Sequence, residues 1–103
     1  MRMTAHAIER WEQRCSHLDM DAELANGKRA GKRLVNALRQ NWERAQGVGT
    51  WPANHSYTVT PGGCLFVISE HGVIITVLLT KDVKRWGRQR VADDRLRRRG
   101  ALI

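Results

Sequence analysis

The sequence predicts an α+β domain: two or three N-terminal helices packed on a three- to four-stranded antiparallel sheet, followed by a basic C-terminal tail. The first observation is a change of period, because apolar residues recur at helical spacing before Gly49 and at strand spacing after it. The second is the turn sequences Pro61-Gly62-Gly63 and Glu70-His71-Gly72, which separate short β-branched runs. The third is length, because 103 residues suffice for one domain with a modest core.

The opening segment predicts an amphipathic helix that Thr4 caps and that runs to Arg14 or Cys15. Its apolar side chains share one stripe at helical spacing: Ile8, Trp11, Cys15 and Leu18. The opposite side carries polar and charged side chains: His6, Arg10, Gln13 and, beside them, Arg14. We therefore expect the histidine and the arginines to point away from the core.

A second helical region begins at Asp19 or Asp21 and ends at Gly47. Asn26-Gly27 and Gly31 weaken its first half. Its second half has an apolar arc made of Leu34, Val35, Leu38, Trp42 and Ala45. A basic cluster lies near the start of that half: Lys28, Arg29, Lys32 and Arg33.

Three strands are predicted over Ser56–Thr60, Cys64–Ser69 and Val73–Thr80. In the last strand one face is wholly apolar, with Val73, Ile75, Val77 and Leu79. The other face is mixed, with Ile74, Thr76, Leu78 and Thr80. We expect the apolar face to pack on the helices and the mixed face to be open to solvent or ligand.

Residues 81–100 hold nine Lys or Arg and three Asp, with few apolar side chains. A short helix or strand near Trp86 is expected here, and 92–103 is predicted to be a mobile basic tail of the single domain 1–103. The net charge of +8 favours a polyanionic partner, either nucleic acid or an anionic membrane. The longest apolar stretch, Val73–Leu79, is far below the ~20 residues that span a bilayer, so no membrane partner is expected.

Two cysteines are too few for a disulfide framework, and the N-terminus has the pattern of a folded helix instead of a signal peptide. We expect a cytoplasmic protein with reduced thiols, and a structural Cys15–Cys64 pair is the alternative. No C-x-x-C or H-x-x-x-H spacing is present, so neither a metal nor another cofactor is expected.

Metal-free RNA cleavage needs a base, an acid and cations around the phosphate. The residues that can supply these groups are His6, Arg10, Arg14, His55, Tyr57, Thr76 and Lys81. The order "TAHAIERWEQR", further helix, then "LFVISEHGVIITVLL" resembles small toxin-like domains of the barnase–EndoU–colicin–RelE ribonuclease superfamily. The resemblance covers these two segments and implies helices on one face of an antiparallel sheet, with the RNA site on the other face.

By this resemblance, His6 is the general acid or base, Arg10 and Arg14 hold the scissile phosphate, and Thr76 orients a phosphate oxygen or a base. Further cations would bind flanking phosphates without sequence preference: Lys28, Lys32, Arg85, Arg88, Arg97, Arg98 and Arg99. The predicted function is a small basic RNA-directed protein, specifically a metal-independent toxin-like ribonuclease from a bacterial or phage-like setting, with a neutralising protein as a further partner.

Two alternatives remain open from the sequence. One is a non-catalytic nucleic-acid-binding or accessory module, in which Trp51 and Trp86 stack on bases. The other is a phage-type protein-interaction domain whose basic tail docks on an acidic surface of a host factor. RNA cleavage in the presence of a chelator separates the ribonuclease from both alternatives.

Overall fold

The computed structural model describes residues 2–101, with the side chains of residues 90–94 and 97–101 outside the description. The elements in chain order are α1 (Ala5–Cys15), α2 (Met20–Ala25), β1 (Lys28–Arg29), α3 (Lys32–Gln46), β2 (Ser56–Val59), β3 (Cys64–Ile68), β4 (Ile74–Leu79) and α4 (Thr80–Ala101). The strands form one sheet in the order β1-β2-β3-β4, and every neighbouring pair is antiparallel. The predicted α+β class, with helices leading into an antiparallel sheet, is confirmed.

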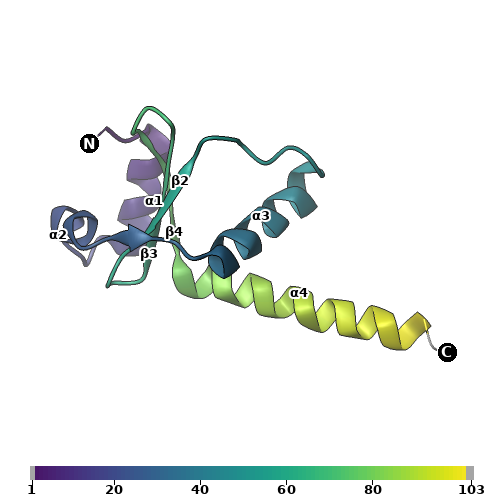
Figure 1. Cartoon of the computed structure of the whole chain (residues 1–103). Helices are drawn as coiled ribbons and strands as arrows, with labels where there is room; N and C mark the ends of the chain where they lie inside the picture. Colours follow the sequence, from purple (N-terminus) through teal and green to yellow (C-terminus); the bar gives the residue numbers. More distant parts are fainter. Residues whose placement is uncertain (1, 102–103) are drawn as a thin grey trace.

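Helices cover both faces of the sheet (Figure 1). On one face, a cluster joins α1 to β3 and β4 through Ala7, Trp11, Cys15, Cys64, Phe66, Ile74 and Val77. On the other face, a second cluster joins α3 and α4 to the sheet through Ala30, Leu38, Tyr57, Leu65, Val67 and Val83. The expectation that one face would remain open is therefore wrong, because α3 and the first turn of α4 pack on that face through Leu38 and Val83.

A bulge in β4 breaks the side-chain alternation that the sequence predicts for this strand. Val67 pairs with Thr76 and Ile68 pairs with Ile74, so the register passes over Ile75. The extra residue resets the alternation, and Ile74 and Val77 lie on the same face although they are three positions apart. Thr76 follows its partner Val67 to the α3–α4 face.

The buried stripe of α1 differs from the predicted one by a small rotation. Thr4 caps the helix as predicted, and its hydroxyl accepts a hydrogen bond from the Ala7 backbone N–H. Ala7 is fully buried, whereas Ile8 is 46% exposed. The small Ala7 side chain lets the helix approach the sheet closely, and the same rotation brings Arg14 to the sheet.

The outer edge of β4 is paired with the chain's N-terminal segment. Met3 forms a parallel bridge with Ile74, and the Ile74 backbone N–H donates to the Arg2 carbonyl at 2.9 Å. The Thr4 backbone N–H donates to the Ile74 carbonyl at 3.0 Å, and the Thr4 hydroxyl donates to the Ile75 carbonyl at 2.9 Å. These bonds cover backbone groups that an edge strand otherwise exposes, and they fix where α1 begins.

The helix α4 is much longer than the short element expected near Trp86, because it continues from Thr80 to Ala101. It leaves β4 directly and extends beyond the sheet to the C-terminal end of the molecule (Figure 1). The radius of gyration is 15.4 Å, above the ~13 Å typical of a compact domain of about 100 residues. Residues 92–101 of the predicted tail are thus helical, and their mobility stays a prediction. No helix within residues 2–101 is long and apolar enough to cross a membrane.

Candidate nucleic-acid interface

The residues proposed for catalysis on α1 lie in different surroundings. His6 is exposed. Arg10 lies one turn further along and donates from Nη1 to Gln13 Oε1 at 2.7 Å. Gln13 in turn donates from Nε2 to Glu9 Oε1 at 3.2 Å. These bonds form a short polar network along the outer surface of the helix.

Arg14 lies against the sheet, in contrast to the prediction that it points away from the core. Its Nη1 donates to the Val77 carbonyl at 2.7 Å, in a partly buried position. A hydrogen bond from a charged donor to a carbonyl at a strand edge holds a helix to that strand. The structure therefore gives Arg14 a packing role between α1 and β4.

The structure does not bring Thr76 together with the α1 residues. Val77 belongs to the cluster under α1, and successive side chains of a strand point to opposite faces. Thr76 is accordingly on the α3–α4 face, beside Val67. The four residues proposed as one catalytic site are divided between the two faces of the sheet.

The other catalytic candidates differ in how far their side chains are exposed to solvent. Tyr57 is buried, and burial raises the pKa of its hydroxyl. His55 is half-buried, and Lys81 is exposed on the first turn of α4. Trp51, proposed for base stacking, is stacked on Tyr57 at a centroid distance of 5.5 Å and an interplanar angle of 16°.

The second stacking candidate, Trp86, is half-buried against the α3–α4 cluster. Trp42 meets Trp51 edge-on at 6.3 Å. The tryptophans on this side of the molecule thus contribute to packing among α3, α4 and the link to β2. Trp42 is the more accessible ring, at 38% exposed.

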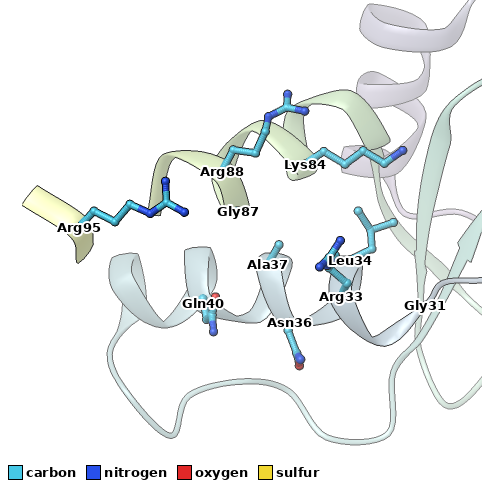
Figure 2. Close-up of a pocket in the computed structure, with 10 residues that line it drawn as sticks. All are labelled: Gly31, Arg33, Leu34, Asn36, Ala37, Gln40, Lys84, Gly87, Arg88 and Arg95. Carbon is cyan, nitrogen blue, oxygen red and sulfur yellow. The ribbon is translucent and has the colours of Figure 1, made fainter. Parts of the chain in front are cut away.

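An open groove of about 1050 Å³ lies between α3 and α4. Figure 2 shows its lining, which consists of Gly31, Arg33, Leu34, Asn36, Ala37, Gln40, Lys84, Gly87, Arg88 and Arg95. Four of these residues are cationic, and no described lining residue is acidic. All four cationic side chains are exposed. The groove therefore concentrates positive charge on a surface that a ligand can reach.

The groove depends on a close approach of the two helices. Gly87 lies opposite Ala37 (Figure 2), and a Cβ atom added at Gly87 would lie 3.2 Å from the Ala37 Cβ. These small residues line the groove together with Leu34. The cationic lining residues are Arg33 on α3 and Lys84, Arg88 and Arg95 on α4.

The cations of α4 follow a single stripe of the helix. At 100° per residue, five described side chains fall within an arc of about 100° that is turned away from buried Val83. They are Lys81, Lys84, Arg85, Arg88 and Arg95. The stripe is about 21 Å long from its first to its last residue, at 1.5 Å per residue. Arg85 lies 3.5 Å from Asp82, so part of its charge is compensated.

The predicted phosphate-binding residues are only partly in this groove. Arg88 lines it, whereas Lys28, Lys32 and Arg85 are exposed but are not among its lining residues. The side chains of residues 97–99 lie outside the description. Arg33, Lys84 and Arg95 line the groove but were not among the predicted phosphate-binding residues, although Arg33 belongs to the predicted basic cluster. The spacing 81, 84, 88, 95 is the helical signal that places α4 cations on one side.

The described residues contain no group of three or more His, Cys, Asp or Glu side chains that could hold a metal ion. Comparison of the chain with protein-family models, with curated proteins and with solved structures gives no match. The resemblance to toxin-like ribonucleases therefore stays a prediction.

Proposed function

We propose that this protein binds single-stranded nucleic acid, RNA in the first instance, through the groove between α3 and α4 and without reading its sequence. The observation that carries the proposal is the set of four exposed cations around one groove with no described acid among the lining residues. Cation contacts to phosphates supply most of the affinity of sequence-independent binding.

The mixed lining of the groove, apolar and cationic, favours a single strand over a duplex. A duplex offers mainly phosphates and sugars to a binding surface, because its bases are stacked inside. A single strand also exposes the faces of its bases, which bind apolar surface. The small and apolar lining residues Leu34, Ala37 and Gly87 suit those bases, and the cationic lining residues suit the phosphates.

The start of α3 adds a further group for a phosphate. Gly31 is the N-cap residue of α3, no side chain caps this end, and Gly31 lines the groove. The N-terminus of a helix attracts anions through its free backbone N–H groups and its dipole. Arg33 lies in the first turn of the same helix, so both groups favour one phosphate at this end of the groove.

Ribonuclease activity remains the alternative, and its supporting observation is the exposed His6 one turn from Arg10. Binding carries more support because the four groove cations act together in one place, whereas the catalytic set is divided between two faces. The further alternative of a protein partner shares the basic surface but requires an acidic protein in place of phosphates.

Binding of a labelled unstructured RNA, measured over a series of salt concentrations, tests the proposal. The logarithm of the affinity is expected to fall linearly with log salt, with a slope of about −0.7 per neutralised phosphate. Arg88→Gln and Lys84→Gln are each expected to reduce the slope by about that amount. Arg39→Gln is the matched control, since Arg39 pairs with Glu43 at 2.9 Å and is not among the groove residues.

Equal losses in all three variants would show that net charge acts, not the groove, and would refute the proposed site. Tighter binding to a duplex of the same length would refute the single-strand preference. An absence of salt-dependent binding would favour a protein partner. RNA cleavage in the presence of a chelator, abolished by His6→Ala, would replace the proposal with the ribonuclease.

A further inference from the structure

Two cysteines far apart in the sequence meet inside the core. Cys15 is the last residue of α1 and Cys64 is the first residue of β3. Their Sγ atoms are 2.9 Å apart, both residues are fully buried, and both thiols are free. The fold has thus placed two sulfurs in contact across 49 positions of the chain.

The surroundings keep the Cys15 thiol protonated while α1 is packed on the sheet. Burial, and then the hydrogen bond between the two thiols, raise the pKa of Cys15 to about 12. A thiol with such a pKa carries its proton at neutral pH, so it reacts slowly as a nucleophile in the folded protein. The rest of the cluster is apolar, with Trp11 and Phe66 nearby in the same core.

We propose that Cys15 and Cys64 are an oxidisable dithiol, which a small-molecule disulfide of the glutathione class converts into a disulfide that fastens α1 to β3. A disulfide has sulfurs about 2.05 Å apart. The sulfurs therefore need to move together by less than 1 Å, a shift that side-chain rotation and a slight settling of α1 can supply. This inference is independent of the proposed nucleic-acid binding.

The chemistry is a thiol–disulfide exchange in two steps. One protein thiol loses its proton and attacks the small disulfide, forming a mixed disulfide and releasing one small thiolate. The second protein thiol loses its proton and attacks the protein sulfur of the mixed disulfide, releasing the second small thiolate. The two protons end on the two released thiols, the protein loses two electrons, and the small disulfide gains them.

Burial of the pair controls when this reaction takes place. An external oxidant reaches the sulfurs only before α1 has packed on the sheet or during a local opening of α1. We expect fast oxidation during refolding and slow oxidation of the folded protein. The same burial protects the disulfide from reductants once it has formed.

Refolding of the full chain with a mixture of oxidised and reduced glutathione tests the proposal, with intact mass as the first measurement. The expected product is a monomer that has lost two hydrogen atoms and carries no bound glutathione. Its melting temperature is expected to exceed that of the reduced protein by roughly 10 °C or more, because the bond closes a loop of about 50 residues. Reduction with dithiothreitol under denaturing conditions is expected to reverse the gain.

Cys15→Ala and Cys64→Ala are the matched variants, since each removes one sulfur and leaves the other as the only thiol. Each is expected to end as a mixed disulfide with glutathione or as a free thiol, with no rise in melting temperature. A refolded natural chain that keeps two free thiols, forms only linked dimers, or melts lower when oxidised would overturn the proposal. The mass of the natural chain decides the question even if a variant fails to fold.

Discussion

Replacing Arg14 with Met separates a packing role from a catalytic one. The change keeps most of the length of the side chain and removes the guanidinium that donates to the Val77 carbonyl at 2.7 Å. A hydrogen bond to a charged group contributes about 1.5–3 kcal/mol to stability, and the partly buried position favours the lower half of that range. A loss of about 2 kcal/mol corresponds to a fall in melting temperature of roughly 8–16 °C for a domain of this size.

Arg10→Met is the matched control on the same helix. Arg10 lies one turn earlier, and its Nη1 donates to Gln13 on the exposed surface. Surface substitutions of this kind usually change stability by less than about 0.5 kcal/mol. Thermal melts followed by circular dichroism compare the two variants directly with the parent.

Equal melting temperatures for Arg14→Met and Arg10→Met would refute the assignment of Arg14 to packing. If Arg14→Met also kept the parent's stability while any RNA cleavage disappeared, the catalytic role implied by the resemblance would be supported instead. The two arginines have the same charge and lie one turn apart on the same helix, but they contact different groups. A difference between the two variants therefore reports on those contacts.

Three further changes probe the core and the groove. Trp11→Ala is expected to cost ~3–5 kcal/mol in urea unfolding, because the ring is buried and stacks on Phe66 at 5.8 Å. Gly87→Leu is expected to cost ~1–3 kcal/mol of stability and to weaken RNA binding. The reason is that even a single added Cβ atom at Gly87 would lie 3.2 Å from the Ala37 Cβ. Unchanged stability and binding would show that the two helices separate freely. The raised pKa of Cys15, about 12 against an ordinary 9.0, favours the protonated thiol in the folded state. Stability is therefore expected to fall from about pH 9 to about pH 12 by up to ~1.4 kcal/mol per pH unit, a dependence that Cys15→Ala reduces.

Local patterns were sufficient to predict the elements but not their mutual arrangement. The predicted strand Cys64–Ser69 differs by one residue from β3, because a short apolar run between turns has few alternatives. The predicted stripe of α1 shared Trp11 and Cys15 with the observed one and failed at Ile8. Whether Ala7 or Ile8 faces the core depends on how the sheet packs against α1. The sequence of the helix by itself does not contain that information.

The candidate site was less predictable than the fold because it arises between elements. The groove needs Gly87 to meet Ala37, which are 50 positions apart. The helix that supplies three of its cations has few apolar residues, so its length gave only a weak periodic signal. The net charge predicts a polyanionic partner but does not say where that partner would bind, whereas the contact between α3 and α4 indicates which surface would bind it.

The bulge in β4 gives an energetic reason to test the groove before a catalytic site on α1. Placing Thr76 beside Arg14 would require the alternation of β4 to shift by one position, which would turn Ile74 or Val77 away from α1. Both side chains are fully buried, and exposing one of them costs about 1.5–3 kcal/mol. The bonds that Thr4 and Arg14 make to the edge of β4 would also have to be remade. The binding of a phosphate on α1 would have to offset the free-energy cost of exposing the buried side chain and of remaking these hydrogen bonds. The groove between α3 and α4, in contrast, presents its cations without any rearrangement of the sheet.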